Sequence, residues 1–172
     1  IPAKNEELTL TKTIENLQKK LNVKIPFSIL IINDHSNDGT IELLANLASK
    51  YSNLKYTSNE WDSGVGNAIR YGLSKWQGDI VALCMADGSD SPEDILLSYK
   101  KISKMGYDCV FGSRFIKGGR VKDYPIIKLI LNRVFNTWVR ILSGNKYNDF
   151  TNIFKIYHRR SIDAISPLNS TG

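Results

Sequence analysis

The chain has 172 residues, of which 42% are hydrophobic and 23% are charged, as expected of one globular domain with a proper core. No apolar run is long enough to cross a bilayer, and the two cysteines, Cys84 and Cys109, have neither disulfide nor metal spacing. Residues 1–99 carry 9 Lys+Arg and 13 Asp+Glu (net −4), whereas residues 100–172 carry 14 and 4 (net +10).

This uneven charge predicts two functional halves within a single domain spanning residues 1–172. The basic half lacks the aromatic-interleaved clusters of nucleic-acid-binding modules, so we expect no nucleic acid partner. A membrane surface, a phosphate-bearing substrate or simply a solvated basic surface fits the charge instead. The chain opens at Ile1 and closes without a clear terminal element. We therefore expect a fragment that lacks its first strand and its C-terminal part, where a membrane anchor could lie.

Short apolar runs alternate with helical patterns over residues 1–112. A strand end at residues 1–3 leads into a helix whose apolar face runs from Leu8 to Leu21. Ser91 and Pro92, followed by two acidic residues, predict the start of another helix. The alternation predicts an α/β fold with a mainly parallel central sheet flanked by helices. Strands are expected at 27–33, 54–57, 80–85 and 107–112, and helices at 41–51, 68–76 and 95–105.

The regular alternation of predicted strands and helices ends after residue 112. A basic loop covers residues 113–120, and a long helix follows from Pro125 to about Leu142. Two interpretations of this helix remain open: it packs its apolar face on the sheet, or it lies in a membrane interface. A strand at 153–157 and a short helix from residue 158 end the pattern. The apolar stripe of the long helix comprises Ile127, Ile130, Leu131, Val134, Trp138, Ile141 and Leu142, and the opposite stripe Lys128, Asn132, Asn136 and Arg140.

Acidic and amide side chains follow three of the predicted strands, at Asn5-Glu6, Asp34 and Asp87. Ligands bind at the carboxyl ends of the strands in open α/β sheets, so a nucleotide diphosphate could lie across this edge. Asp34 could accept a hydrogen bond from a ring N–H of the base. Asp87 could hold a divalent cation on the phosphates, or it could only cap a turn together with Asp90.

Arg114 could add a two-point phosphate contact. Several other site types are disfavoured. The Gly64-Val65-Gly66 segment lacks the third glycine of a dinucleotide fingerprint. There is no Walker-type phosphate loop and no serine nucleophile elbow. The two histidines, His35 and His158, do not have the spacing of a zinc site.

Six segments occur in this order: IPAKNEE, INDHSNDGT, GVGNAIRYGL, GDIVALCMADGSDSPED, FGSRF and DFTNIFKIYHR. Together they resemble, in the same order, the inverting family-two glycosyltransferases, and most closely their dolichol-phosphate mannosyltransferase-like branch. The resemblance implies the GT-A fold (nucleotide-diphospho-sugar transferase, Rossmann-like). It implies transfer of a sugar from a GDP- or UDP-sugar to a polyprenyl (dolichyl or undecaprenyl) phosphate, with inversion, by a protein in peripheral contact with the cytoplasmic face of a membrane.

The resemblance also assigns roles to individual residues. Residues 1–99 become the nucleotide-sugar half and residues 100–172 the acceptor half. Asp87 would hold Mg²⁺ or Mn²⁺ on the diphosphate with help from Ser89 or Asp90, and Arg114 and Arg133 would contact the acceptor phosphate or the leaving group. Asp149 would lie close to the sugar and acceptor, with Thr151 and Asn152, and forms the expected catalytic set with Asp87 and Arg114. The nucleotide would be lined by Pro2, Ala3, Asn5, Glu6, Asp34, Gly66 and Asp87.

Three positions depart from the family pattern. Asn33-Asp34 replaces a pair of aspartates, and Asn can still bond a base. Met85-Ala86-Asp87 replaces an Asp-Ala-Asp metal motif and removes one carboxylate, and Asn152-Ile153 replaces a Ser-Gly pair near the acceptor.

Two alternative functions therefore remain. The chain could be a family-two transferase acting on a polysaccharide or another small acceptor, with Asp149 as its base, or a weakly active nucleotide-binding assembly subunit.

Overall fold

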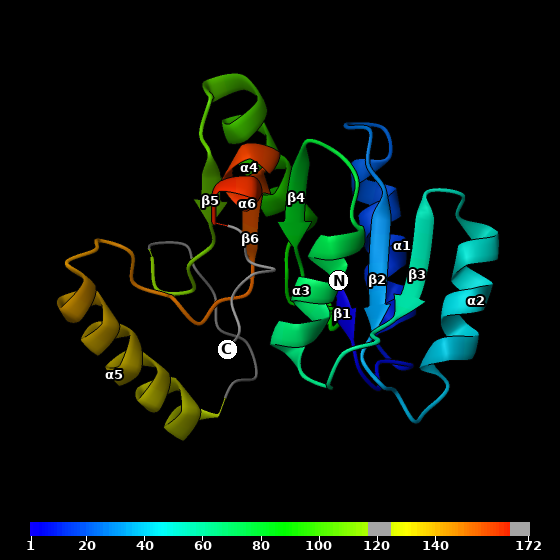
Figure 1. Ribbon diagram of the computed structural model, residues 1–172, viewed down its shortest axis with the longest axis horizontal. Helices are drawn as coiled ribbons and strands as arrows, with labels where there is room; N and C mark the ends of the chain where they lie inside the picture. The colour runs from blue at the N-terminus through cyan, green and yellow to red at the C-terminus, as the bar shows by residue number, and fades with distance from the viewer. Residues whose placement is uncertain (117–124, 166–172) are drawn as a thin grey trace.

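The structure, a computed structural model, describes residues 1–116 and 125–165 (Figure 1). The predicted basic segment at residues 118–120 lies outside the described residues. Helices and strands alternate from β1 to α4, as the sequence predicts. The elements are β1 (Pro2–Ala3), α1 (Leu10–Leu21), β2 (Ile29–Asn33), α2 (Thr40–Lys50), β3 (Leu54–Ser58), α3 (Val65–Lys75), β4 (Ile80–Leu83), α4 (Pro92–Met105), β5 (Cys109–Phe111), α5 (Ile126–Ser143), β6 (Lys155–His158) and α6 (Arg159–Ile165).

The first sheet is parallel and has the strand order β1-β2-β3. Its register pairs Pro2 with Ile32 and Ile29 with Leu54. Helix α3 packs on β1 and β2, whereas α1 lies behind the sheet in Figure 1. Because all three strands run in one direction, the loops that follow them emerge at a single edge. The parallel sheet flanked by helices confirms the predicted α/β class.

The second sheet has the order β4-β6-β5, and β6 runs antiparallel to both of its neighbours. It combines β4, from the first half of the sequence, with β5 and β6 from the second. The predicted division at residue 99 is therefore not a boundary between sheets. Strand β6 can insert between β4 and β5 because the chain returns to the sheet after the long excursion through α5 (Figure 1).

One hydrophobic core joins the two sheets. It contains fully buried residues of α1 and β2, among them Ile14 and Ile31, together with Ile95 of α4 and Ile156 of β6. Helices α1 and α4 also contact each other, so their packing fixes the first sheet relative to the second. This shared core holds the loops after β1, β2 and β4 in a common framework.

Local sequence signals explain where two helices begin. Ser91 caps α4 as predicted, because its hydroxyl oxygen accepts hydrogen bonds from the backbone N–H groups of Glu93 and Asp94 at 3.2 and 3.4 Å. Helix α3 begins at Val65, three residues earlier than predicted. Gly64 precedes it with a φ of 148°, a conformation that glycine adopts readily, and the chain turns there directly into the helix.

Helix α5 does not pack its apolar face on the sheet, which was the first of the two interpretations of its sequence. Its apolar stripe is open to solvent, with Leu131 63%, Trp138 64% and Leu142 78% exposed. The buried residue of the helix is Asn136, from the polar stripe. The interpretation that the apolar face packs on the sheet is thus wrong. The amide side chains of Asn132 and Asn136, rather than apolar side chains, attach this helix to the turn before β6. Among the described residues, no helix is both long and apolar enough to span a bilayer.

Replacing Ser91 by Ala should lower the free energy of unfolding by about 1 kcal/mol, because the first-turn N–H groups of α4 lose their side-chain acceptor. Urea unfolding followed by circular dichroism measures the loss. Ser103→Ala is the matched control, since Ser103 is an exposed serine within the same helix. Equal effects of the two substitutions would contradict the assigned cap.

Candidate active site

Loops after the strands of the first sheet meet at the edge toward which the arrows of β2 and β3 point in Figure 1. The backbone N–H of Asp34 donates to the carbonyl oxygen of Ala3 at 2.7 Å. The Asn5 side-chain oxygen accepts from the N–H of Asn37 at 2.8 Å, and the Asn5 N–H donates to the Ser36 hydroxyl at 3.0 Å. The structure therefore brings together the predicted nucleotide-binding residues after β1 and β2.

The four predicted residues at the start of the chain are placed differently from one another. Pro2 and Ala3 are buried strand residues, whereas Asn5 is exposed and has a φ of 56°. Glu6 is half-buried, its N–H donates to the Thr40 hydroxyl at 2.9 Å, and its carboxylate accepts from a neighbouring threonine. Asn5 is thus the most open of the four, and their contact with a nucleotide stays a prediction.

Asp34 is 3% exposed and organises the loop between β3 and α3. One carboxylate oxygen accepts from the Asn59 amide at 2.8 Å, and the other accepts from the Gly64 N–H at 2.9 Å and the Ser63 hydroxyl at 3.3 Å. Burial acts to raise the pKa of the Asp34 carboxyl, but these hydrogen bonds outweigh it and hold the pKa below its ordinary value. The carboxylate therefore stays ionised and fixes the loop, and its contact with a base stays a prediction.

Gly66 is exposed in the first turn of α3 and has no neighbouring atom within 4 Å of a built Cβ position. Backbone N–H groups in the first turn of a helix lack partners within the helix and favour anions. The predicted nucleotide-binding role of Gly66 is compatible with this open position, which the Asp34 contacts hold near the carboxyl end of β2.

The loop after β4 presents Asp87 to solvent. One oxygen of its carboxylate accepts from the Ser89 N–H at 2.9 Å, so the turn-capping alternative is observed. Gly88 has a φ of 72°, and a Cβ there would lie 2.9 Å from the Thr13 hydroxyl oxygen. That same hydroxyl donates to the Ala86 carbonyl oxygen at 2.8 Å. The loop is thus held on α1 with the Asp87 carboxylate on its outer side.

Asp90 points inward from the same loop. Its carboxylate accepts from the Met85 N–H at 2.7 Å. Burial raises the pKa of Asp90 to about 6, despite that hydrogen bond, and repulsion from Asp87 and Asp94 adds to the rise. Within residues 1–116 and 125–165, no three His, Cys, Asp or Glu side chains lie close enough to bind a metal unaided. One exposed carboxylate still fits a hard cation that takes its other ligands from phosphates and water.

The predicted acceptor residues meet around a buried carboxylate. Asp149 is fully buried and accepts from Arg114 at 2.9 Å (Nε) and 2.7 Å (Nη2), a two-point ion pair. The Arg114 backbone N–H donates to the same carboxylate at 2.9 Å. Asp149 therefore fixes the direction of the Arg114 guanidinium, and its catalytic role stays a prediction.

Arg133 of α5 and Arg114 both contact the same aromatic ring, that of Phe115. The guanidinium carbon of Arg114 is 5.4 Å from the ring centre of Phe115, and that of Arg133 is 4.7 Å from it. Both distances are within the range of cation–π contact. The structure thus gathers the two arginines predicted to bind an acceptor phosphate, 19 residues apart in the sequence.

Sequence reasoning missed three residues at this position. The Phe115 ring contacts both arginines, and Asn132 and Asn136 of α5 hydrogen-bond to each other and to Thr151. The spacing of four between the two asparagines was a visible signal, but it shows only that they share a helix face. Thr151 and Asn152, predicted near the acceptor, lie in the turn before β6, and the Asn152 amide donates to the Gly112 carbonyl oxygen at 3.1 Å.

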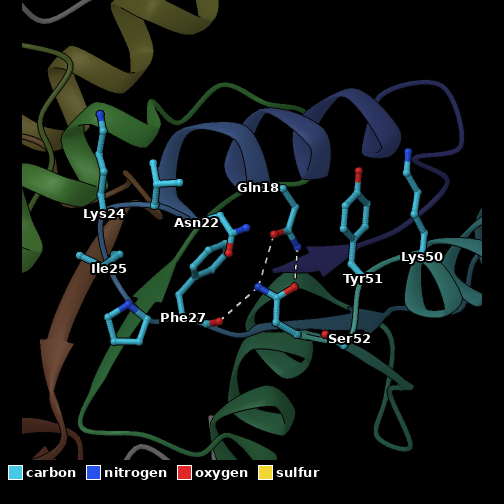
Figure 2. A pocket seen from close by; sticks show the side chains of 11 residues that line it. Gln18, Asn22, Lys24, Ile25, Phe27, Lys50, Tyr51 and Ser52 are labelled. Atoms are coloured by element: carbon cyan, nitrogen blue, oxygen red, sulfur yellow. Dashed lines mark hydrogen bonds between the residues drawn. The ribbon is translucent and has the colours of Figure 1, made fainter.

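A shallow pocket of about 670 Å³ lies away from this edge, where α1 ends and β2 begins (Figure 2). Gln18 and Asn53 exchange amide hydrogen bonds in it, at 2.7 and 3.4 Å, and Asn53 also donates to the Phe27 carbonyl oxygen at 3.2 Å. None of the predicted site residues is among the described residues that line it. These hydrogen bonds tie α1 to the amino ends of β2 and β3.

Replacing Asp34 by Asn should lower the free energy of unfolding at pH 7 by about 1 to 3 kcal/mol. The partly buried Gly64 N–H, the Asn59 amide and the Ser63 hydroxyl would lose a charged acceptor. A folded-state pKa below the ordinary value stabilises the protein above that value and ceases to do so as pH falls through the folded-state pKa. The difference from wild type should therefore shrink below about pH 4, as urea unfolding at several pH values can show.

Asp62→Asn is the matched control, because Asp62 is an exposed carboxylate in the same loop. A difference between wild type and Asp34→Asn that is absent at pH 7, or that grows in acid, would contradict the assigned role of Asp34.

Comparisons with known proteins place this geometry in a family. Dolichol-phosphate mannosyltransferase of Pyrococcus furiosus is 29% identical over 133 residues, covering 77% of this chain and 37% of the relative. Polyprenol monophosphomannose synthase of Mycolicibacterium smegmatis is 30% identical over 151 residues, covering 84% of this chain and 56% of the relative. The chain thus spans between about a third and a little over half of these relatives.

A solved structure shows the same fold. A mannosyltransferase from Pyrobaculum calidifontis, in complex with GDP-Man and Mn²⁺, superposes with a TM-score of 0.65 at 15% identity, over 95% of this chain and 44% of that one. The model of the family described as glycosyl transferase family 2 matches residues 1–166. The chain therefore belongs to glycosyl transferase family 2 and has its GT-A fold.

Proposed function

We propose that this chain is the catalytic part of an enzyme that transfers a sugar, with inversion, from a nucleotide sugar to a polyprenyl phosphate. The observation that carries the proposal is the pair of arginines, Arg114 and Arg133, which both contact Phe115 beside a helix whose apolar face is exposed. A phosphate on a long apolar chain presents the complementary chemistry. The names of the two curated relatives, both synthases of polyprenyl-linked mannose, support the same acceptor class.

The donor side of the proposal uses the loops at the carboxyl edge of the first sheet and the loop after β4. The Pyrobaculum mannosyltransferase binds GDP-Man and Mn²⁺, and we propose a GDP- or UDP-sugar with Mn²⁺ or Mg²⁺ for this chain. Asp87 would hold the metal, with Ser89 next to it in the same loop. A bound divalent cation would neutralise charge on the departing diphosphate. Met85 stands where the family pattern has a second metal-binding carboxylate. We therefore expect the protein to bind the metal tightly only when the phosphates of a nucleotide supply further ligands.

The acceptor side explains why no general base is needed. A lipid phosphate is already ionised at neutral pH and can attack the anomeric carbon directly. Arg114 would orient that phosphate, and in-line positioning would give inversion in a single displacement. Transfer to a sugar hydroxyl would instead require a free carboxylate base, and Asp149 is fully buried against Arg114. This contact favours the phosphate acceptor over a polysaccharide.

Helix α5 supplies the membrane contact in this proposal. Its exposed apolar side chains form one continuous stripe, and its charged residues are Lys128, Arg133 and Arg140, with no acidic residue. An apolar stripe flanked by cations suits an anionic lipid surface. In Figure 1, α5 stands apart from the two sheets on the side toward which β2, β3 and β4 point. Placement at the cytoplasmic face of a membrane stays a prediction.

Asp87→Asn should abolish metal-dependent nucleotide binding, because the exposed carboxylate is the proposed protein ligand of the metal. Calorimetry with UDP and with GDP, each with and without Mn²⁺, measures this directly. We expect wild type to bind one nucleotide at least tenfold more tightly with Mn²⁺, and the variant to lose that gain.

Asp79→Asn is the matched control, since Asp79 is an exposed carboxylate at the opposite end of β4. Binding that is independent of metal in both proteins would overturn the metal assignment. Metal-dependent binding without any sugar transfer would instead favour the nucleotide-binding assembly subunit.

Replacing both Leu131 and Trp138 by Ser should weaken binding to anionic vesicles by at least tenfold, because each side chain contributes roughly 1.5 kcal/mol or more when buried in lipid. Both lie on the same face of α5 and are already exposed, so folding should be unaffected. Co-sedimentation with phosphatidylglycerol vesicles at low and high salt measures the affinity.

The matched control replaces Leu8 and Val23, which are 90% and 87% exposed elsewhere on the surface, by Ser. Equal losses in the two double variants, or no wild-type binding to vesicles, would contradict a membrane role for α5.

A further inference from the structure

A single hydroxyl group joins α5 to the arginine of the candidate acceptor site. The Thr151 Oγ1 donates to the Asn132 side-chain oxygen at 2.8 Å, and it accepts from Arg114 Nη2 at 3.0 Å and from the Asn136 amide at 3.2 Å. A hydroxyl has one donor and two acceptor positions. The three shortest contacts fill these positions and go to residues of α5 or to Arg114, while an Asp149 carboxylate oxygen lies 3.4 Å away as a longer alternative acceptor.

Asn136 strengthens the same junction. Its side-chain oxygen accepts from the Phe150 N–H at 2.5 Å, and its amide nitrogen also donates to the Asn132 carbonyl oxygen at 2.9 Å. Asparagine is a poor helix former, yet two asparagines lie one turn apart within this 18-residue helix. Their placement is explained by the turn at residues 149–152, which they hold against the helix.

The Arg114 guanidinium is therefore fixed from two sides. Asp149 fixes it from the protein interior through the two-point ion pair, and Thr151 fixes it relative to α5. If α5 lies on a membrane, the depth of the helix in the lipid surface sets the height of Arg114 above that surface. A phosphate on a membrane-embedded chain can reach the arginine only within a narrow range of heights.

We propose that Thr151, held by Asn132 and Asn136, is a positioning residue that sets Arg114 at the level of a membrane-borne phosphate. The inference rests on the proposed function of the acceptor site. It assigns to Thr151 no contact with the sugar or the metal. Loss of its hydroxyl should remove the hydrogen-bonded link between Arg114 and α5, leaving the contacts of both arginines with Phe115 and the two-point Arg114–Asp149 ion pair in place.

The test compares two acceptors in the Thr151→Val variant, which keeps the side-chain shape at an exposed position. With a long polyprenyl phosphate in phosphatidylglycerol vesicles, kcat/KM should fall about tenfold or more, the usual effect of losing a hydrogen bond to a charged group. With farnesyl phosphate free in solution the fall should be under about threefold, because a mobile phosphate can follow a displaced arginine.

Three readouts distinguish positioning from a general structural effect. Thr151→Ser, which keeps the hydroxyl, should restore activity with the vesicle-borne acceptor to within about twofold of wild type. Thr137→Val is the matched control, because the exposed Thr137 hydroxyl donates to the Arg133 carbonyl oxygen within α5 and not to the junction. Vesicle affinity and calorimetric nucleotide affinity should be unchanged in all three variants.

An equal fall with both acceptors, or no fall with either, would overturn the inference while the proposed function stands. A wild-type protein that transfers sugar to neither phosphate would overturn the proposed function itself, and the inference with it.

Discussion

A fully buried carboxylate must be paired, because an isolated charge in a protein interior costs several kcal/mol. Asp149 is such a carboxylate, and its partner is Arg114. The pair fixes the turn before β6 against the loop after β5, positions 35 residues apart in the sequence. Asn132, Asn136 and Phe115 then attach α5 to this pair, so the orientation of the whole acceptor side follows from one ion pair.

The proposed nucleotide site is organised by a second buried carboxylate, which has no cationic partner in hydrogen-bonding contact among the described residues. Asp34 is satisfied by an amide, a hydroxyl and a backbone N–H, which together hold the loop before α3 at the end of β2. Both buried carboxylates therefore fix loops of the candidate site. Asp87, in contrast, is exposed on a loop that α1 supports, as expected of a group that meets a metal only when a nucleotide is present.

Local patterns predicted the parts of the fold that depend on local chemistry. The apolar runs gave the strands, and Ser91-Pro92 gave the start of α4. The rule that parallel strands end at one edge brought Asn5 and Asp34 together correctly. The insertion of β6 between β4 and β5 was not predictable from these patterns, since it depends on pairing between segments more than 40 residues apart.

The hydrophobic periodicity of α5 did not predict how this helix packs. It showed that one face is apolar and the other polar, but not which face meets the protein. The decisive contacts are amide and hydroxyl hydrogen bonds from Asn132 and Asn136 to the turn at Thr151, which have no periodic signature. The Arg114–Asp149 pair was likewise invisible to spacing, although the resemblance to the family had singled out both residues.

The chemical identity of the acceptor tests the central claim most directly. Wild-type protein would be incubated with Mn²⁺ and radiolabelled GDP-mannose or UDP-glucose, and with either a polyprenyl phosphate or the polyprenol of the same chain length. If the two arginines receive a phosphate that needs no base, label should pass to the polyprenyl phosphate and not to the alcohol. Equal labelling of the alcohol, or labelling only of an added polysaccharide, would contradict the account.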